Sequence, residues 1–229
     1  MKIGVFDSGL GGLSILTEIR RLLPEYDYLY IGDNARAPYG TRSFDVIYEY
    51  TWQAVQYLMA QDCRLIILAC NTASAKALRT IQQRNIDPEK VRVLGVIRPT
   101  VEAVSGTKHI GILATPGTVN SESYVIELSK IDPDVRVSQQ ACPMWVPLIE
   151  NGEKDSPAMD YFIDKYLSAL LRQDPEISTI LLGCTHYPFA SHTIARILGG
   201  NVDGLDGGPG TAREALRRLK NAGLLEEGE

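Results

Sequence analysis

The chain has 229 residues and a formal net charge of −5 at pH 7, and 45% of its residues are hydrophobic. This composition is typical of a globular protein with one large domain or two small ones. Its apolar runs are far shorter than the roughly 20 residues of a membrane span. No basic run is interleaved with aromatic residues, so we expect neither a membrane nor a nucleic acid as partner.

Cysteine usage indicates a reduced, cytoplasmic protein. The chain has 4 cysteines, namely Cys63, Cys70, Cys142 and Cys184, without any C-x-x-C pair. This number is too small for a disulfide framework in a chain of this length, and the spacing predicts no structural zinc site. The first residues, MKIGVFDSGLGG, also lack the apolar region of a signal peptide.

Short branched apolar runs alternate with helical patterns along the chain. We predict strands at residues 2–6, 28–32, 65–69, 92–97, 109–113, 135–139, 179–182 and 202–205. An apolar stripe at helical spacing runs from Leu13 to Leu23, and further helices are predicted at residues 46–58, 73–84, 119–130, 158–172, 189–198 and 210–222. This alternation predicts an α/β fold with mostly parallel sheets flanked by helices.

The two halves of the sequence resemble each other. The strand and turn KIGVFDSG have a counterpart in HIGILATPG, and LIILACNTAS has one in TILLGCTHYP. We therefore predict two pseudo-symmetric domains, residues 1–97 plus 208–229 and residues 98–207, with the boundary near Pro99, which suits the first turn of a helix. Ligands of such sheets bind beyond the carboxyl ends of the strands, so the active site is expected in the cleft between the domains.

Cys70 and Cys184 each follow an apolar strand and precede a predicted helix. The N-terminus of a helix favours an anion, and we expect it to lower the pKa of such a thiol. Taken alone, each cysteine is better explained as a small buried hydrophobic residue. His186, which titrates near neutrality, and the paired placement favour two thiols in one cleft. There they could bind a metal together with His186, form a disulfide or transfer protons.

Polar residues follow other predicted strands as well. Asp7 and Ser8 precede a glycine turn that lets the backbone approach a ligand closely, although the turn lacks the G-x-G-x-x-G spacing of a dinucleotide site. The PYG turn at residues 38–40 is stiff and presents a phenol and backbone amides. Thr118 precedes a predicted helix, where capping is the simplest explanation. Glu150 follows an apolar segment, as many solvated loop acids do.

Taken together, these residues predict a site that binds a small acid through hydroxyls, amides and helix ends. Inverting the α-carbon of an amino acid requires a base on one face and an acid on the other. One thiolate can remove the α-proton while the opposite thiol donates another, provided that the site stabilises the carbanion-like transition state. Asp7 and His186 are candidate proton-relay partners of Cys70 and Cys184.

The motifs FDSGLGGLS, GDNARAPYG, ACNTAS, ATPGTVNS, ACPMWVPLIE and LGCTHYP, which run from residue 6 to residue 188, together resemble the glutamate racemases of the cofactor-independent aspartate/glutamate racemase superfamily. The resemblance implies that Cys70 and Cys184 are the two acid/base groups and that Glu150 supports His186. It also implies that the following residues contact the amino acid or tune the thiols: Asp7, Ser8, Pro38, Tyr39, Gly40, Asn71, Thr72, Thr118, Thr185 and His186. Finally, it implies a homodimer without cofactor or metal that supplies D-glutamate for peptidoglycan.

The chain departs from the family pattern in two places. Arg98 stands where the family usually has an acidic residue, and residues 151–178 form a shortened region. These departures affect the expected domain junction and dimer more than the chemistry. Two alternatives stay open at this point: a racemase of aspartate or another acidic amino acid, and a non-catalytic module that binds an amino acid.

Overall fold

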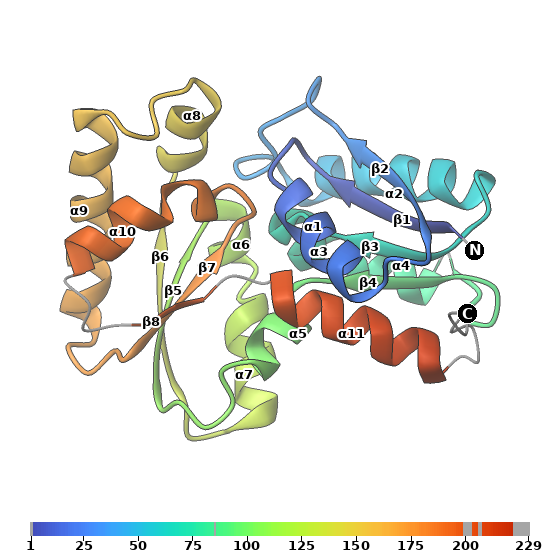
Figure 1. Ribbon diagram of the computed structural model, residues 1–229. Coiled ribbons are helices and arrows are strands. Elements are labelled where there is room, and N and C mark those ends of the chain that lie inside the picture. The colour runs from blue at the N-terminus through green and yellow to red at the C-terminus, as the bar shows by residue number, and fades with distance from the viewer. Residues whose placement is uncertain (1, 85, 199–202, 206–207, 222–229) are drawn as a thin grey trace.

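The computed structural model describes residues 2–84, 86–198, 203–205 and 208–221. Two four-stranded sheets lie next to each other, and helices cover the faces of each sheet (Figure 1). All strand pairs within the two sheets are parallel. None of the described helices has the length and apolar character needed to cross a membrane.

The first sheet has the strand order β2-β1-β3-β4. Its strands are β1 (Lys2–Asp7), β2 (Asp27–Gly32), β3 (Cys63–Leu68) and β4 (Arg92–Gly95). The helices around it are α1 (Leu13–Leu22), α2 (Phe44–Ala60), α3 (Asn71–Lys76) and α4 (Leu78–Arg84). The inner strands β1 and β3 are almost continuously apolar and buried, as strands covered on both faces must be.

The second sheet repeats this arrangement in the order β6-β5-β7-β8. Its strands are β5 (His109–Ala114), β6 (Arg136–Ala141), β7 (Thr179–Gly183) and β8 (Asp203–Leu205). Its helices are α5 (Ile97–Glu102), α6 (Pro116–Asn120), α7 (Ser123–Ile131), α8 (Trp145–Glu150), α9 (Pro157–Gln173), the 3-10 helix η1 (Tyr187–Ala190) and α10 (Ser191–Leu198). Helix α11 (Gly208–Asn221) follows.

Matching positions in the two sheets demonstrate the internal pseudo-symmetry. Val5 pairs with Ile67 in the first sheet, and Ile112 pairs with Leu181 in the second. Each pair joins the first strand of a half, β1 or β5, to the strand that precedes a cysteine, β3 before Cys70 or β7 before Cys184. The predicted α/β class with two related halves is therefore confirmed.

Each sheet buries a separate hydrophobic cluster on each face. Ala212 and Ala215 of α11 pack into the cluster that contains Ile3 and Ile19, so the last helix returns to the first sheet. The predicted domain limits, residues 1–97 plus 208–229 and residues 98–207, stay a prediction. Residues 199–202, 206–207 and 222–229 lie outside the described part of the chain.

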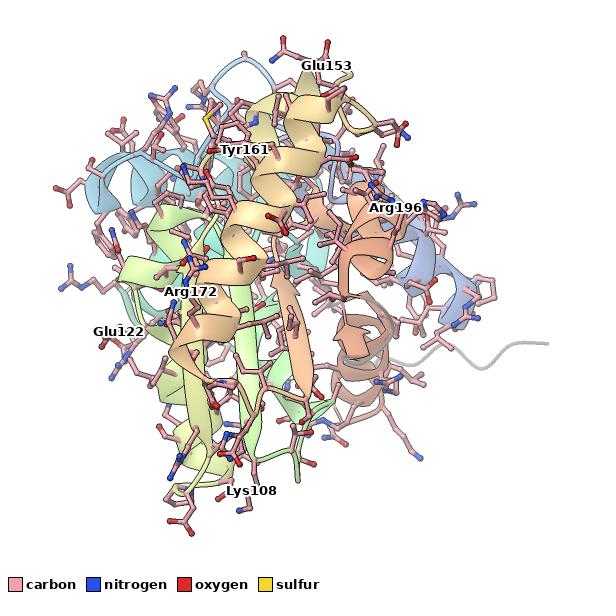
Figure 2. All side chains as sticks on the ribbon, turned by 90° about the vertical axis from the view of Figure 1, so that its left-hand side faces the viewer. Lys108, Glu122, Glu153, Tyr161, Arg172 and Arg196 are labelled. Carbon is pink, nitrogen blue, oxygen red and sulfur yellow. The ribbon has the colours of Figure 1, made fainter. Side chains whose placement is uncertain are left out.

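Helix α9 covers the outer side of the second sheet. It buries Ile163 and Leu170 in the same cluster as Trp145, while Tyr161 and Arg172 point outward (Figure 2). Serine at the N-cap and proline in the first turn begin this helix in the way its sequence predicts.

Several elements differ from their predicted limits. The helix expected at residues 73–84 is divided into α3 and α4, and the one expected at residues 119–130 is divided into α6 and α7. The second break occurs where Glu122 adopts a left-handed conformation, with φ of 54°. Strand β4 ends at Gly95 instead of residue 97, and α8 was not predicted. The predicted strand start at residue 202 lies outside the described residues.

Candidate active site

A cavity of about 480 Å³ lies between the two halves of the molecule. Its walls come from the segments that follow the carboxyl ends of the strands in both sheets. These segments contribute the lining residues Ser8, Asn34, Pro38, Tyr39, Gly40, Cys70, Asn71, Thr72, Thr115, Cys142, Val146, Pro147, Glu150, Asn151, Cys184, Thr185 and His186, among others. The cavity therefore lies where the sequence predicted a cleft.

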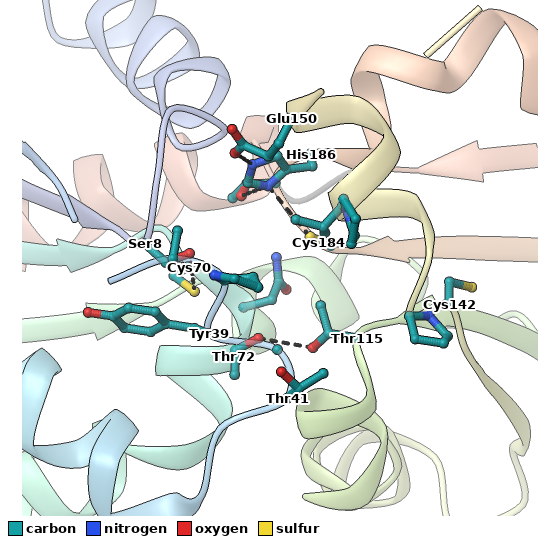
Figure 3. Close-up of a pocket in the computed structure, with 18 of the residues that line it drawn as sticks. Ser8, Tyr39, Thr41, Cys70, Thr72, Thr115, Cys142, Glu150, Cys184 and His186 are labelled. Carbon is teal, nitrogen blue, oxygen red and sulfur yellow. Dashed lines mark hydrogen bonds and ion pairs between the residues drawn. The ribbon is translucent and has the colours of Figure 1, made fainter. Parts of the chain in front are cut away.

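Both predicted thiols line this cavity. Cys70 follows β3 as the N-cap of α3, and Cys184 directly follows β7 (Figure 3). The Cys70 thiol donates a hydrogen bond to Ser8 Oγ at 3.5 Å, and its sulfur accepts one from the Ala73 amide at 3.5 Å. The exposed fractions of Cys70 and Cys184 are only 5% and 8%, so neither sulfur is a freely solvated surface group.

The two thiols are weaker acids than the sequence led us to expect. Burial raises the pKa of Cys70 to about 11, and the negative charge of Asp7 adds to this effect despite opposing hydrogen bonds from Ser8 and Ala73. Burial likewise raises the pKa of Cys184 far above its ordinary range. The expected lowering of these pKa values was wrong, because desolvation outweighs the effect of the short helices that follow, α3 after Cys70 and the 3-10 helix η1 after Cys184. Both thiols of the ligand-free protein are protonated at neutral pH.

His186 lies between Glu150 and Cys184. Its Nε2 makes a short hydrogen bond with Glu150 Oε1, while its Nδ1 lies 3.9 Å from Cys184 Sγ and 3.4 Å from Thr185 Oγ1. A carboxylate can only accept a hydrogen bond, so Nε2 carries the hydrogen, and in the neutral ring Nδ1 is an acceptor directed toward Cys184. His186 can thus take the thiol proton or, once protonated, stabilise the thiolate.

Asp7 lies behind the cavity wall and is completely buried. Its Oδ2 accepts hydrogen bonds from the amides of Gly9 at 3.1 Å and Gly12 at 3.0 Å, and its Oδ1 accepts one from Thr185 Oγ1 at 3.4 Å. Burial is the main cause that raises the pKa of Asp7, and the charge of His186 opposes it. Asp7 thus contacts the Cys184 segment directly, whereas its expected partner Cys70 is hydrogen-bonded to Ser8.

Comparison with known proteins shows to which family the chain belongs. The sequence pattern of the Asp/Glu/Hydantoin racemase family matches residues 3–215. The chain belongs to this family. It is therefore a racemase, and the resemblance predicted from the motifs is confirmed.

Relatives and solved structures of this racemase family cover nearly the whole chain. A glutamate racemase of Geobacter metallireducens is 39% identical over 226 residues, which are 97% of this chain and 82% of that protein. The structure of the Francisella tularensis glutamate racemase in complex with D-glutamate has a TM-score of 0.91 and 35% identity, and the match covers 100% of this chain and 84% of that one. The Thermus thermophilus enzyme, in complex with β-chloro-D-alanine, has a TM-score of 0.86 and 37% identity, with coverage of 99% and 83%.

The glycine turn after β1 serves a different purpose from the one predicted. A Cβ atom at Gly12 would lie 2.5 Å from Asp7 Cβ, and one at Gly11 would lie 2.6 Å from Thr185 Oγ1. The missing side chains thus allow close approach to other residues of the protein, and neither glycine lines the cavity. The turn joins the two halves beside the Cys184 segment.

The PYG turn reaches the cavity with all three of its residues, Pro38, Tyr39 and Gly40. The phenol of Tyr39, however, is not presented to a ligand as predicted. Its hydroxyl donates a hydrogen bond to Asp33 Oδ2 at 2.5 Å, and the side chain is almost completely buried.

Thr115 lines the cavity, whereas the predicted contact Thr118 is buried behind it. Thr115 Oγ1 lies 3.0 Å from Thr72 Oγ1 and 3.1 Å from Thr118 Oγ1, so the three hydroxyls form one network across the two halves. Sequence reasoning missed Thr115 as a site residue. It directly follows β5, as Cys184 follows β7, so the rule that ligands bind at strand ends could have found it.

Other lining residues were also missed. Asn34 and Cys142 follow β2 and β6, and the same strand-end rule applies to them. Val146, Pro147 and Asn151 come from α8 and the residue after it. No local sequence signal predicted that α8 would cover the cavity.

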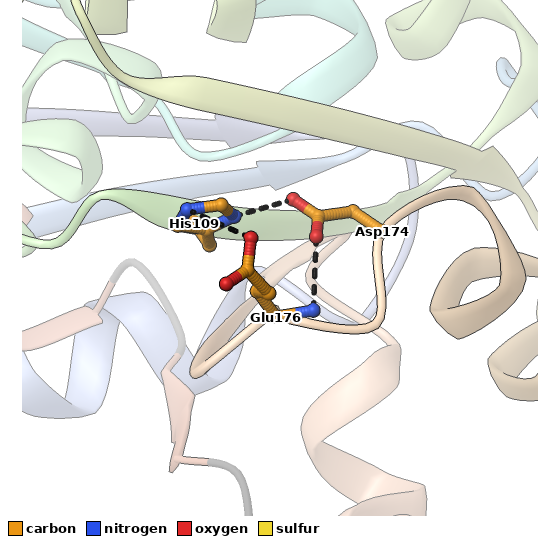
Figure 4. A group of neighbouring side chains, drawn as sticks. All are labelled: His109, Asp174 and Glu176. Carbon is orange, nitrogen blue, oxygen red and sulfur yellow. Dashed lines mark hydrogen bonds and ion pairs between the residues drawn. The ribbon is translucent and has the colours of Figure 1, made fainter.

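A second polar cluster lies at the opposite end of β5. His109 Nδ1 is 2.7 Å from Asp174 Oδ2, and its Nε2 is 3.6 Å from Glu176 Oε2 (Figure 4). Among the described residues, these three side chains form a group of potential metal ligands whose ligand atoms lie close to one another. The two carboxylates face different nitrogens of one ring, and a single ion cannot bind both nitrogens. The contacts instead tie the loop after α9 to the start of β5.

Proposed function

We propose that this racemase interconverts L- and D-glutamate by proton transfer between Cys70 and Cys184. The observation that carries the proposal is that Cys70 and Cys184, which follow equivalent strands of the two related halves, line one cavity. Inversion of an α-carbon needs a base on one face and an acid on the other. Two chemically identical groups meet this need in both reaction directions, because they exchange roles with the enantiomer.

The resting state requires that one thiol lose its proton before it can act as the base. The imidazole of His186, held by Glu150, faces Cys184 and can accept that proton. The imidazolium and the ammonium group of the substrate are then cations close to the thiolate, and a cation lowers the pKa of an adjacent thiol. Substrate binding is therefore part of the activation of the site.

Hydroxyl and amide groups around Cys70 supply hydrogen bonds for a carboxylate. Ser8, Asn71, Thr72 and Thr115 line the cavity and are neutral. Hydrogen bonds that shorten as charge develops on the α-carboxylate stabilise the carbanion-like transition state.

Glutamate is the proposed substrate because the relatives that match most of the chain are named glutamate racemases, and one related structure contains D-glutamate. A racemase of aspartate or another acidic amino acid would use the same chemistry in a pocket of different depth. Membership in the racemase family argues against a non-catalytic binding module. We further propose, from the family resemblance, a cytoplasmic homodimer without cofactor that supplies D-glutamate for peptidoglycan.

The test is an assay of the purified protein with L-glutamate and L-aspartate separately, without added cofactor. Circular dichroism follows the loss of optical activity, and deuterium uptake from solvent at the α-carbon follows proton exchange. We expect Cys70→Ala and Cys184→Ala each to lower kcat by about 10² to 10⁴-fold. Cys63→Ala is the matched control, because Cys63 is equally buried but begins β3 at the end opposite to Cys70.

Full racemisation by either Cys70→Ala or Cys184→Ala would overturn the two-thiol mechanism. A preference for aspartate would overturn the assignment of glutamate while leaving the mechanism intact. Circular dichroism in the far ultraviolet shows whether each variant is folded, which separates loss of chemistry from loss of structure.

A further inference from the structure

A buried hydrogen bond joins the two halves behind the Cys70 segment. The hydroxyl of Tyr124, near the start of α7, donates to Asn71 Oδ1 at 2.7 Å. Asn71 is the residue after Cys70 and lines the cavity, whereas Tyr124 is completely buried and does not line it. We propose that Tyr124 is a positioning residue that fixes the Asn71 amide with its NH₂ group toward the substrate. This inference rests on the proposed function.

The orientation of an asparagine amide determines what the side chain offers. One end is a carbonyl oxygen that only accepts hydrogen bonds, and the other is an NH₂ group that only donates them. The Tyr124 hydroxyl donates a hydrogen bond to the carbonyl oxygen of Asn71, so the NH₂ group of Asn71 remains available to donate hydrogen bonds into the cavity. A substrate carboxylate only accepts hydrogen bonds. A flipped Asn71 would therefore place one acceptor against another.

The surroundings of Tyr124 make this orientation persistent. Its ring packs among Val101, Ile112 and Leu128 in the hydrophobic cluster between α5, α7 and the second sheet. Because the Tyr124 side chain has no exposed surface, its hydroxyl donates to Asn71 without competition from solvent at the Tyr124 oxygen. Ser123 Oγ also donates to the Ala75 carbonyl at 3.3 Å, so the start of α7 is held against α3 at a second point.

The experiment compares Tyr124→Phe with the unmodified protein and with Tyr28→Phe. The matched control removes a hydroxyl that donates to the Leu23 carbonyl at 2.6 Å, outside the cavity wall. Without its donor, Asn71 can turn its carbonyl toward the substrate, which costs a hydrogen bond to a charged group. We expect KM for L-glutamate to rise by about 10-fold or more in Tyr124→Phe, and kcat to fall as well, because the hydrogen bond from Asn71 to the carboxylate strengthens in the transition state. Tyr28→Phe should leave both constants unchanged.

Two further measurements keep the inference falsifiable. In an Asn71→Ala background, Tyr124→Phe should have no additional effect on KM, because its action passes through Asn71. Calorimetric binding of L-glutamate to the Cys70→Ala protein, with and without Tyr124→Phe, should show the same weakening without any turnover. An unchanged KM or affinity in Tyr124→Phe overturns the inference. An unmodified protein that neither binds nor racemises glutamate overturns the proposed function itself.

Discussion

Gly11→Ala tests how closely the two halves approach beside the catalytic groups. The added Cβ would lie 2.6 Å from Thr185 Oγ1, 2.9 Å from Thr185 Cβ and 2.9 Å from His186 Nδ1, whereas ordinary contacts begin at 3.4 Å. Thr185 Cβ adjoins the backbone, so a change of side-chain rotamer cannot remove the clash. The segment that carries Cys184 must move away from the glycine turn by a distance on the order of 1 Å.

A displacement of this size has a different effect on stability than on catalysis. Overpacking costs about 1–3 kcal/mol of the free energy of unfolding. Moving a catalytic group by about 1 Å lowers the rate by about 10²-fold. We therefore expect Gly11→Ala to fold, with a reduced melting temperature and a kcat about two orders of magnitude lower.

Gly111→Ala provides the matched control. Its Cβ would lie 2.8 Å from Leu170 Cδ2 and 3.2 Å from Ile177 Cγ2, in the interior of the second half and away from the cavity. Thermal unfolding and circular dichroism kinetics are measured for both variants. A similar loss of stability with normal kcat is expected for Gly111→Ala. If Gly11→Ala also retained normal kcat, the tight contact would have no role in placing His186 and Cys184.

Four other predictions concern the site. Because both thiols have raised pKa values, kcat/KM should increase from about pH 7 to about pH 9, and a flat profile would contradict the protonated resting state. The free energy of unfolding should fall as pH rises from about 9 to about 11, since the unfolded chain releases thiol protons that the folded protein retains, and Cys70→Ala should reduce this slope in denaturant titrations. Glu150→Gln removes the carboxylate that holds His186 Nε2, so kcat should fall by about 10 to 100-fold with nearly unchanged KM. Glu153, an exposed residue nearby, provides the control, and an equal fall in kcat in Glu153→Gln would refute this role of Glu150. Thr115→Val removes a cavity hydroxyl and the N-cap of α6, so KM should rise and the free energy of unfolding should fall by about 1 kcal/mol. Ser156→Ala removes the N-cap of α9, away from the cavity, and should lower only the free energy of unfolding.

The raised pKa values of Cys70 and Cys184 protect the two sulfurs from unwanted reactions. A protonated thiol is a poor nucleophile, and both sulfurs are almost completely buried. In the proposed mechanism, the thiolate forms when cationic groups are close, which links the formation of the base to the binding of an amino acid. A permanently formed thiolate would not depend on substrate in this way.

Several features of this protein could be predicted from local sequence. Branched apolar runs specify buried strands, and the polar residues at their carboxyl ends meet at one edge of each parallel sheet. This rule placed Cys70 and Cys184 at one cavity although they are far apart in the chain. The repeated motif pattern also predicted two related α/β halves, which the matching strand orders of the two sheets bear out.

Other features depended on contacts between distant segments and were decided only by the tertiary structure. Desolvation by the surrounding protein reversed the expected direction of the thiol pKa shift, because burial is a property of the folded chain and not of the residues adjacent to a cysteine. The start of α6 at residue 116 determined that Thr115, and not the predicted Thr118, lines the cavity. The position of α8 over the cavity was determined by packing. The hydrogen bond from Tyr124 to Asn71 joins the two halves, and no local pattern encodes such a contact. Local sequence thus determined which residues end the strands, while packing of the two halves determined the environment and orientation of each side chain.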